Sequence, residues 1–210
     1  DKGARIIVFP ELGITGYTCS DLFRQDILLN GAKKALKEIV AASKGMDGLF
    51  FVGLPLEVNG KLYNVAAAYS DGELLGLVPK SYIPNYSEFY EARHFTPAPE
   101  GCSYGSWPEE NAVPFGTDQL FTCKNMPGLK VAVEICEDLW TPNPPSVRHA
   151  MNGATVIVNL SASDEVTGKD SYRRDLVKLQ SGRLVCGYIY ASAGEGESST
   201  DLVFGGHHLI

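Results

Sequence analysis

Three reactive side chains in this sequence each lie one or two residues beyond a run that favours β structure. They are Glu11, Lys80 and Cys136. In sheet proteins, chemistry commonly collects outside the carboxyl ends of strands, because the loops that follow neighbouring strands meet there. We therefore expect the carboxylate, the ammonium group and the thiol to share one site.

These three groups are suited to cleaving an amide. A thiol with a pKa near about 8.5 is mostly protonated at neutral pH, so a nucleophilic cysteine needs a base or a nearby positive charge. Glu11 can accept the Cys136 proton and deliver it to the departing amine. Lys80, with the backbone N–H of Glu137, can stabilise the oxyanion of the tetrahedral intermediate. Water then hydrolyses the thioester.

Each of the three residues also has a purely structural explanation. Cys136 ends an apolar run and could be a buried core thiol, Glu11 could cap a turn, and Lys80 could be a solvated charge at the end of a strand. Taken one at a time, the residues leave both alternatives open.

Other motifs that carry chemistry are incomplete. The five cysteines include no Cys-x-x-Cys pair, and the four histidines lack metal-ligand spacing, so we expect neither a disulfide framework nor a metal site. The run Gly194–Ser198 lacks the Lys-Ser/Thr ending of a phosphate loop and contains two acids, which repel phosphate.

Composition favours one globular domain with a sizeable core, since the 210 residues are 44% hydrophobic and 20% charged. The net charge of -7 argues against nucleic acid as the main partner, because no basic stripe is present to contact phosphates. No apolar run is long enough to span a membrane, and the start does not resemble a signal peptide. We expect a cytoplasmic protein without a membrane partner.

The first half of the sequence predicts a strand over residues 6–9, an amphipathic helix before Gly45 and then three antiparallel strands. Asn59-Gly60 and Asp71-Gly72 are typical of tight hairpin turns between those strands. The apolar positions of the helix are Leu29, Ala32, Leu36, Ile39 and Val40. The segment from Pro84 to Pro114 has no clear period, so we expect a long irregular loop there.

The second half predicts alternating strands and helices. We expect strands over 120–123 and 130–135 around a turn at 126–128, a short helix capped by Ser146, and a buried strand over 154–160. A helix over 169–184 and a strand over 188–191 follow. The apolar side chains expected to face inward from this helix are Tyr172, Leu176, Leu179 and Leu184. Sheets covered by helices, in a layered α/β or α+β architecture, fit this order.

The segments around the three reactive residues resemble the Glu-Lys-Cys signature of the nitrilase superfamily. More narrowly, they are similar to the glutaminase domain of glutamine-dependent NAD synthetases. The matching segments are Phe9-Pro10-Glu11-Leu12 with Thr15-Gly16-Tyr17, Lys80 with Ile83-Pro84-Asn85-Tyr86 and Glu88-Phe89-Tyr90-Glu91, Glu134 to Trp140, Asn159 to Ser163, Gly168-Lys169 with Tyr172-Arg173-Arg174, and Ser199 to Gly206.

The resemblance implies an α/β fold, the nitrilase-like α-β-β-α sandwich, with Glu11 as base, Lys80 as stabiliser and Cys136 as nucleophile. A second acid, Glu91 rather than Glu88, would orient these groups. The residues that would bind glutamine or line its pocket are Tyr17, Tyr86, Glu137, Ser163 and Lys169. A carboxylate and an ammonium group on one substrate call for a cation or hydroxyls and for an acceptor, which this set contains.

The resemblance also implies partners that lie outside the sequence. Ammonia would pass to a synthetase domain that amidates nicotinic acid adenine dinucleotide, and ATP and magnesium would belong to that domain, so no cofactor is expected here. The sequence has no Ser-Gly-Gly-x-Asp-Ser run for ATP. Because only ten residues precede Glu11, we expect residues 1–210 to form one hydrolase domain that is incomplete at both ends. The resemblance further implies a homo-oligomer.

Two other functions remain open. The same fold and residues could act on another small amide, a nitrile or an N-carbamoyl compound. The chain could also be a binding or assembly module that retains the residues without catalysis.

Overall fold

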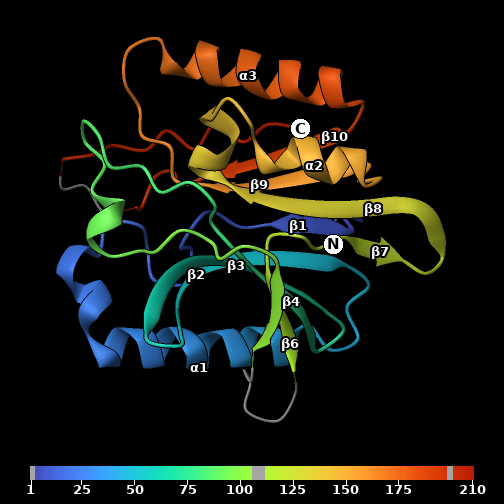
Figure 1. Cartoon of the computed structure of the whole chain (residues 1–210), viewed down its shortest axis with the longest axis horizontal. Coiled ribbons are helices and arrows are strands. Elements are labelled where there is room, and N and C mark those ends of the chain that lie inside the picture. Colours follow the sequence, from blue (N-terminus) through green and yellow to red (C-terminus); the bar gives the residue numbers. More distant parts are fainter. Residues whose placement is uncertain (1–2, 106–111, 198–200) are drawn as a thin grey trace.

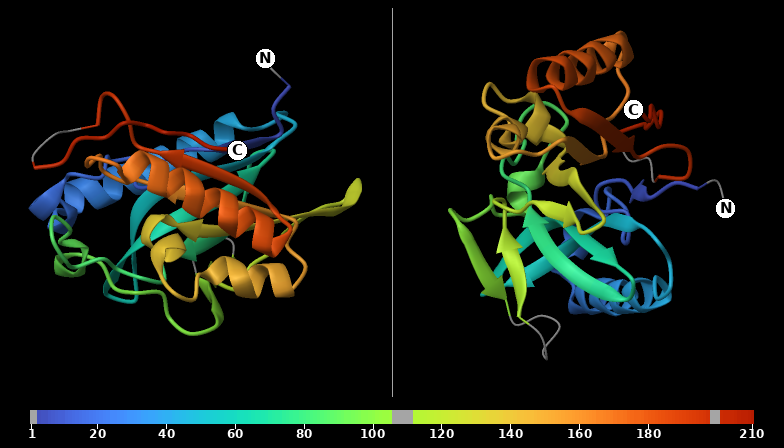
Figure 2. Two further views of the ribbon diagram at one scale, coloured as in Figure 1. Left: turned by 90° about the horizontal axis from the view of Figure 1, so that it is seen from above. Right: turned by 90° about the vertical axis from the view of Figure 1, so that its right-hand side faces the viewer.

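Two β-sheets face each other in the middle of the molecule and are covered by helices on their outer faces (Figure 1). The computed structural model describes residues 3–105, 112–197 and 201–210. Helix α1 (Asp26–Ala42) covers one sheet, whereas α2 (Pro145–Met151) and α3 (Lys169–Leu184) cover the other (Figure 2). This order of layers confirms the α-β-β-α sandwich.

The first sheet has the strand order β1-β2-β3-β4-β6-β5. Its centre is the antiparallel run β2-β3-β4, joined at Asn59-Gly60 and Asp71-Gly72, where all four residues have positive φ. Both predicted hairpins are thereby confirmed. The strands are β1 (Ile6–Val8), β2 (Leu49–Val58), β3 (Lys61–Ser70), β4 (Glu73–Pro79), β5 (Cys102–Gly105) and β6 (Val113–Gly116).

The second sheet has the order β10-β9-β8-β7. Strands β8, β9 and β10 are parallel, so their carboxyl ends lie at one edge. Short 3-10 helices lie in the loops between these elements. They are η1 (Ser20–Arg24), η2 (Glu91–Arg93) and η3 (Cys136–Trp140). The strands are β7 (Phe121–Cys123), β8 (Met126–Ile135), β9 (Val156–Ser161) and β10 (Gly187–Ser192).

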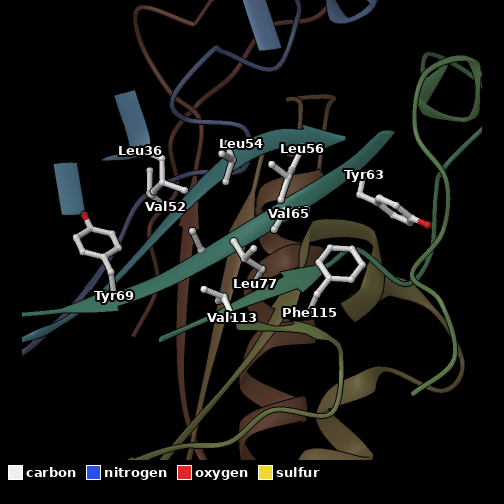
Figure 3. Packing of buried hydrophobic residues seen from close by; sticks show 11 residues of the cluster. Leu36, Val52, Leu54, Leu56, Tyr63, Val65, Tyr69, Leu77, Val113 and Phe115 are labelled. Carbon is white, nitrogen blue, oxygen red and sulfur yellow. The ribbon is translucent and has the colours of Figure 1, made fainter. Parts of the chain in front are cut away.

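Successive side chains of β2 point to opposite faces of the sheet and pack into two different hydrophobic cores. Val52 and Leu54 point to α1 with Leu36 (Figure 3), whereas Phe51 faces the second sheet and packs with residues such as Val158. This period-2 alternation follows from the pleat of a strand. Burial of both faces makes the sheets a rigid frame for the residues at their ends.

Several local predictions were wrong. The segment 84–114 is not irregular throughout: it contains η2, strand β5 and the start of β6. Strand β6 pairs with β5 and, through the buried Phe115, with Leu77 of β4. Strand β8 begins at Met126, so the turn lies at 124–125. Pro144, not Ser146, is the residue that precedes α2; Ser146 is buried in its first turn.

Helix α3 was predicted with the correct ends, but only part of its inner face was predicted correctly. Leu176 and Leu184 pack against the core as expected. Tyr172 and Leu179 are exposed, whereas Arg173, Val177 and Gln180 are buried. The buried arginine and glutamine have hydrogen-bond partners inside, which a purely apolar criterion does not detect. No helix in the described ranges is long and apolar enough to cross a membrane.

Candidate active site

Lys80 lies fully buried between two carboxylates at the end of β4. Its Nζ is 2.7 Å from Glu11 Oε1 and 2.7 Å from Glu91 Oε1. Burial opposes the ammonium charge, but the two carboxylates outweigh burial and raise the pKa of Lys80 well above its usual value. The residue is therefore a fixed positive charge and not a solvated lysine at a strand end.

Glu11 is held by donors from three directions. Besides Lys80, its Oε1 accepts a hydrogen bond from Asn64 Nδ2 at 2.7 Å, and its Oε2 accepts one from the backbone N–H of Ala162 at 2.9 Å. Asn64 lies on β3 and Ala162 follows β9, so both sheets orient the carboxylate. Three donors fix the orientation of the carboxylate, as a general base requires.

Gly53 in the middle of β2 allows the Glu11 loop to lie on the sheet. A Cβ at this position would come within 2.3 Å of Leu12 N and 2.9 Å of Glu11 C, distances too short for any side chain. A glycine inside a strand often marks such a close approach of another backbone segment. The position of Glu11 therefore depends on a residue 42 positions away in the sequence.

Cys136 lies at a sharp turn where β8 passes directly into η3. Its φ of 42° is in the left-handed region, which is unfavourable for a non-glycine residue by about 1–2 kcal/mol. Its backbone N–H donates to Asn159 Oδ1 at 3.0 Å, which supports this conformation. The turn presents a side chain that is 6% exposed.

The surroundings of the Cys136 thiol disfavour its ionised form. Burial, followed by the nearby charge of Glu11, raises its pKa well above the usual value, and the charge of Lys80 opposes this only in part. The thiol therefore lies within electrostatic reach of both residues. Deprotonation has to accompany attack, with a neighbouring group accepting the proton.

The second acid at Lys80 is Glu91, not Glu88. Glu91 begins η2 and accepts hydrogen bonds from Lys80 and from the Tyr17 hydroxyl, which lies 2.8 Å away. Burial is the main reason that its pKa is raised to about 7. Glu88 lies further out, along the wall of a cavity.

Cys136 lines a cavity of about 270 Å³ that includes four of the five predicted substrate residues: Tyr86, Glu137, Ser163 and Lys169. Tyr17 lines a neighbouring cavity instead, together with Glu91. Phe89 and Trp140 form apolar walls of the Cys136 cavity. The volume is slightly below the roughly 300–1,000 Å³ of pockets for drug-sized ligands, so it suits a small metabolite.

The polar side chains of this cavity already contact protein groups. The Tyr86 hydroxyl lies 3.0 Å from Glu137 Oε1, and Lys169 Nζ forms an ion pair with Asp164. Lys169 also lies 5.4 Å from the centre of the Phe89 ring. Because an ammonium group has three donors, Lys169 can keep Asp164 and still bind a substrate carboxylate.

Ser163 is oriented by Arg173 of α3. Arg173 is only 1% exposed, and it donates to Ser163 Oγ at 3.2 Å, to the carbonyl of Asp164 at 3.0 Å and to Glu165 Oε1 at 2.8 Å. The serine hydroxyl thus keeps its own hydrogen available to donate to a ligand. In the described ranges, no three His, Cys, Asp or Glu side chains are placed to hold a metal ion.

Sequence reasoning missed the polar residues that support the site. Asn64, Asn159 and Asp138 are each about 1% exposed or less. Asn64 and Asn159 interrupt otherwise apolar strands, which is a usable signal, because a buried amide has to find partners. The partners themselves were not predictable, since they come from distant segments.

Comparisons with known proteins show which family the chain resembles. The chain matches the carbon-nitrogen hydrolase family over residues 1–207. It is 44% identical over 211 residues to the glutamine-dependent NAD(+) synthetase of Mycobacterium tuberculosis, a match that covers 100% of this chain and 31% of that relative. This chain therefore spans about a third of the length of the relative.

Solved structures similar to this chain belong to the same kinds of protein. A glutamine-dependent NAD(+) synthetase from Cytophaga hutchinsonii matches with a TM-score of 0.85 and 32% identity, over 99% of this chain and 34% of that chain. Saccharomyces cerevisiae Nit3, a member of branch 10 of the nitrilase superfamily, shares the fold with a TM-score of 0.69 at 18% identity, over 98% of this chain and 68% of Nit3. With the family match over residues 1–207, these findings establish that the chain belongs to the carbon-nitrogen hydrolase family.

Proposed function

We propose that this chain hydrolyses the side-chain amide of glutamine to glutamate and ammonia. The observation that carries the proposal is the fully buried Lys80, held between Glu11 and Glu91, within electrostatic reach of a thiol that opens into a small polar cavity. Its support from relatives is that the similar proteins are glutamine-dependent NAD(+) synthetases.

Acylation begins when the substrate amide carbon lies against Cys136 Sγ. Glu11 accepts the thiol proton as sulfur attacks the carbonyl carbon, and the carbonyl oxygen becomes an oxyanion. Lys80 and the backbone N–H of Glu137 stabilise that charge. Glu11 then delivers its proton to the amide nitrogen, the carbon–nitrogen bond breaks, and ammonia leaves behind a thioester.

Deacylation uses the same groups with water as the nucleophile. Glu11 accepts a proton from water as the oxygen attacks the thioester, and Lys80 again stabilises the oxyanion. The carbon–sulfur bond breaks, the proton returns to the Cys136 sulfur, and glutamate is released. Glu91 retains the orientation of Lys80 through both steps.

The cavity side chains fit a zwitterionic amino acid. Glu137 and the Tyr86 hydroxyl can accept hydrogen bonds from the α-ammonium group, while Lys169 and Ser163 can bind the α-carboxylate. Tyr17 contributes indirectly, by its hydrogen bond to Glu91. Asp164 limits the free charge of Lys169, so the carboxylate is bound without an uncompensated cation.

The ammonia would serve a synthetase domain in a larger protein, as in the relatives of which this chain spans 31%. That domain would use ATP and magnesium to amidate nicotinic acid adenine dinucleotide, and this chain would need no cofactor of its own. We further propose a cytoplasmic homo-oligomer. Gel filtration with light scattering measures the oligomeric state.

Ammonia release by the purified protein tests the proposal. Glutamine should be hydrolysed much faster than propionamide, a nitrile or an N-carbamoyl amino acid, because only glutamine presents both charged groups to the cavity. Faster turnover of a simple amide would favour another carbon–nitrogen hydrolase activity. A glutamine-like chloroketone should label Cys136 selectively among the five cysteines, and unselective labelling would favour a non-catalytic module.

A further inference from the structure

Asp138 joins the two sheets directly behind the candidate active site. Its side chain is buried, with 1% exposure. One carboxylate oxygen, Oδ1, accepts hydrogen bonds from the backbone N–H groups of Ser81 at 3.0 Å and Tyr82 at 2.8 Å. The other, Oδ2, accepts one from the backbone N–H of Ile135 at 2.9 Å.

The two segments that Asp138 holds are the ones that carry Lys80 and Cys136. Ser81 is the residue after Lys80, which directly follows β4 of the first sheet. Ile135 ends β8 of the second sheet and is the residue before Cys136. Because β4 and β8 belong to different sheets, no ladder of backbone hydrogen bonds fixes their separation. One side chain therefore bridges the stabilising cation and the nucleophile.

Capping of η3 explains only one of these three contacts. Asp138 is the third residue of η3, and its acceptance of a hydrogen bond from the N–H of the N-cap residue Ile135 is a usual contact at a helix start. A cap has no need of the Ser81 and Tyr82 N–H groups, which come from the opposite sheet. The hydrogen bonds of Oδ1 to Ser81 and Tyr82 therefore indicate a role for Asp138 beyond stabilising the start of η3.

Burial makes a carboxylate an unfavourable choice for a purely structural role. Burial is the main reason that the pKa of Asp138 is raised to about 8. Well-packed apolar residues can often replace buried charges without loss of stability. What an apolar side chain cannot do is accept hydrogen bonds from two backbone segments at once.

We propose that Asp138 is a positioning residue that sets the separation between the Lys80 ammonium group and the Cys136 thiol. This inference rests on the proposed amide hydrolysis. In that reaction the oxyanion forms on the carbon that Cys136 attacks, and it has to lie within reach of Lys80. A displacement of about 1 Å between such groups lowers a rate by about 100-fold.

The substitution Asp138→Asn tests the bridge with almost no change in shape. An amide offers one acceptor oxygen, so it can satisfy Ser81 and Tyr82 or Ile135, but not both segments. We expect kcat for glutamine to fall about 10–100-fold with KM within about threefold. Hydrogen exchange should become faster at the amides of the released segment.

Gln119→Glu is the matched control. Gln119 is also buried, and its amide nitrogen bridges the carbonyl groups of Leu77 and Gly116 at 2.8 Å each, but it lies away from the cavity. Replacing the Gln119 side-chain amide by a carboxylate removes those hydrogen bonds. The midpoint of thermal unfolding should therefore fall at least as far as in Asp138→Asn. The value of kcat should stay within about threefold of the unmodified protein.

The possible outcomes separate the two proposals. An Asp138→Asn variant with faster amide exchange and unchanged kcat refutes the positioning role, and unchanged exchange refutes the bridge itself. Absence of ammonia release by the unmodified protein contradicts the proposed function. In that case amide hydrogen exchange still tests whether Asp138 connects the two segments. If Asp138→Asn does not fold, Asp138→Glu keeps both acceptors but separates the segments, so kcat should fall with the amides still protected.

Discussion

The interior and the mouth of the candidate site are built on opposite principles. In the interior, Glu11, Lys80 and Glu91 are at most 5% exposed and each contacts another charged group. At the mouth, Tyr86 is 54% exposed, and its hydroxyl meets Glu137 at the surface. The interior resembles a core in which charges replace apolar groups, whereas the mouth resembles an ordinary protein surface.

The difference indicates how the two regions divide the reaction. Charges in a dry, fixed frame act strongly on a developing oxyanion and need no rearrangement as it forms. Exposed groups contribute less energy per contact but can adapt as a ligand enters. We therefore expect substitutions in the interior to change kcat and substitutions at the mouth to change KM.

The strongest test of this division is Cys136→Ala. The variant should lose at least about 10³-fold in kcat for glutamine, because no other group can form the thioester. Cys186→Ala removes another buried thiol, which lies against the carbonyl of Ala154 away from the cavity, and should keep its activity. Steady-state ammonia release compares the two. Comparable turnover by Cys136→Ala would contradict the interior mechanism altogether.

Lys80→Met should damage both chemistry and stability. It leaves Glu11 and Glu91 buried without their cation, and breaking such a buried ion pair costs about 3–5 kcal/mol of unfolding free energy. We expect kcat to fall about 10²–10³-fold as well.

Lys44→Met is the surface counterpart. Lys44 and Asp71 form an exposed pair at 3.6 Å, and exposed pairs of this kind contribute little to stability. Urea denaturation of both variants measures the contrast. Equal losses of unfolding free energy would show that the buried ion pairs of Lys80 stabilise the fold no more than an exposed pair does.

Glu91→Gln should change how stability depends on pH. The folded protein raises the pKa of Glu91 from 4.5 to about 7, mainly by burial, so it retains a proton that the unfolded chain has lost. The unfolding free energy contributed by this group therefore falls as the pH rises from about 4.5 to about 7.

Denaturation at pH 5 and pH 7.5 measures this dependence. The unmodified protein should lose on the order of 1–3 kcal/mol more than Glu91→Gln between the two pH values. Glu88→Gln, a carboxylate at the cavity wall, should behave like the unmodified protein. A slope that survives in Glu91→Gln would assign the titration to another group.

Tyr86→Phe should have the smallest effect and confine it to binding. Loss of the hydroxyl removes a contact with Glu137 at the mouth, and KM for glutamine should rise about 3–10-fold with kcat within twofold. Tyr82→Phe is matched, because its exposed hydroxyl contacts the carbonyl of Asn143 outside the cavity, and it should change neither parameter. A fall in kcat larger than the rise in KM would contradict the assignment of Tyr86 to substrate binding.

The sequence predicted what periodicity and turn residues encode. The β2–β3–β4 meander, the ends of α3 and the order of the layers follow from local pattern and from the resemblance. The inner face of α3 was predicted only in part: Leu176 and Leu184 pack inward as expected, whereas Arg173 and Gln180 are buried by specific partners and not by apolarity. Asn64 was missed for the same reason: a hydrogen bond to Glu11, 53 residues away, has no local signature.

The burial of the Cys136 thiol also determines its resistance to oxidation. Peroxides react with thiolates, and a thiol that is 6% exposed and has a raised pKa offers almost none in the resting protein. Because the proton leaves only as the sulfur attacks a bound substrate, that substrate occupies the cavity through which an oxidant would enter. We therefore expect hydrogen peroxide to oxidise Cys136 slowly, although it has no disulfide partner.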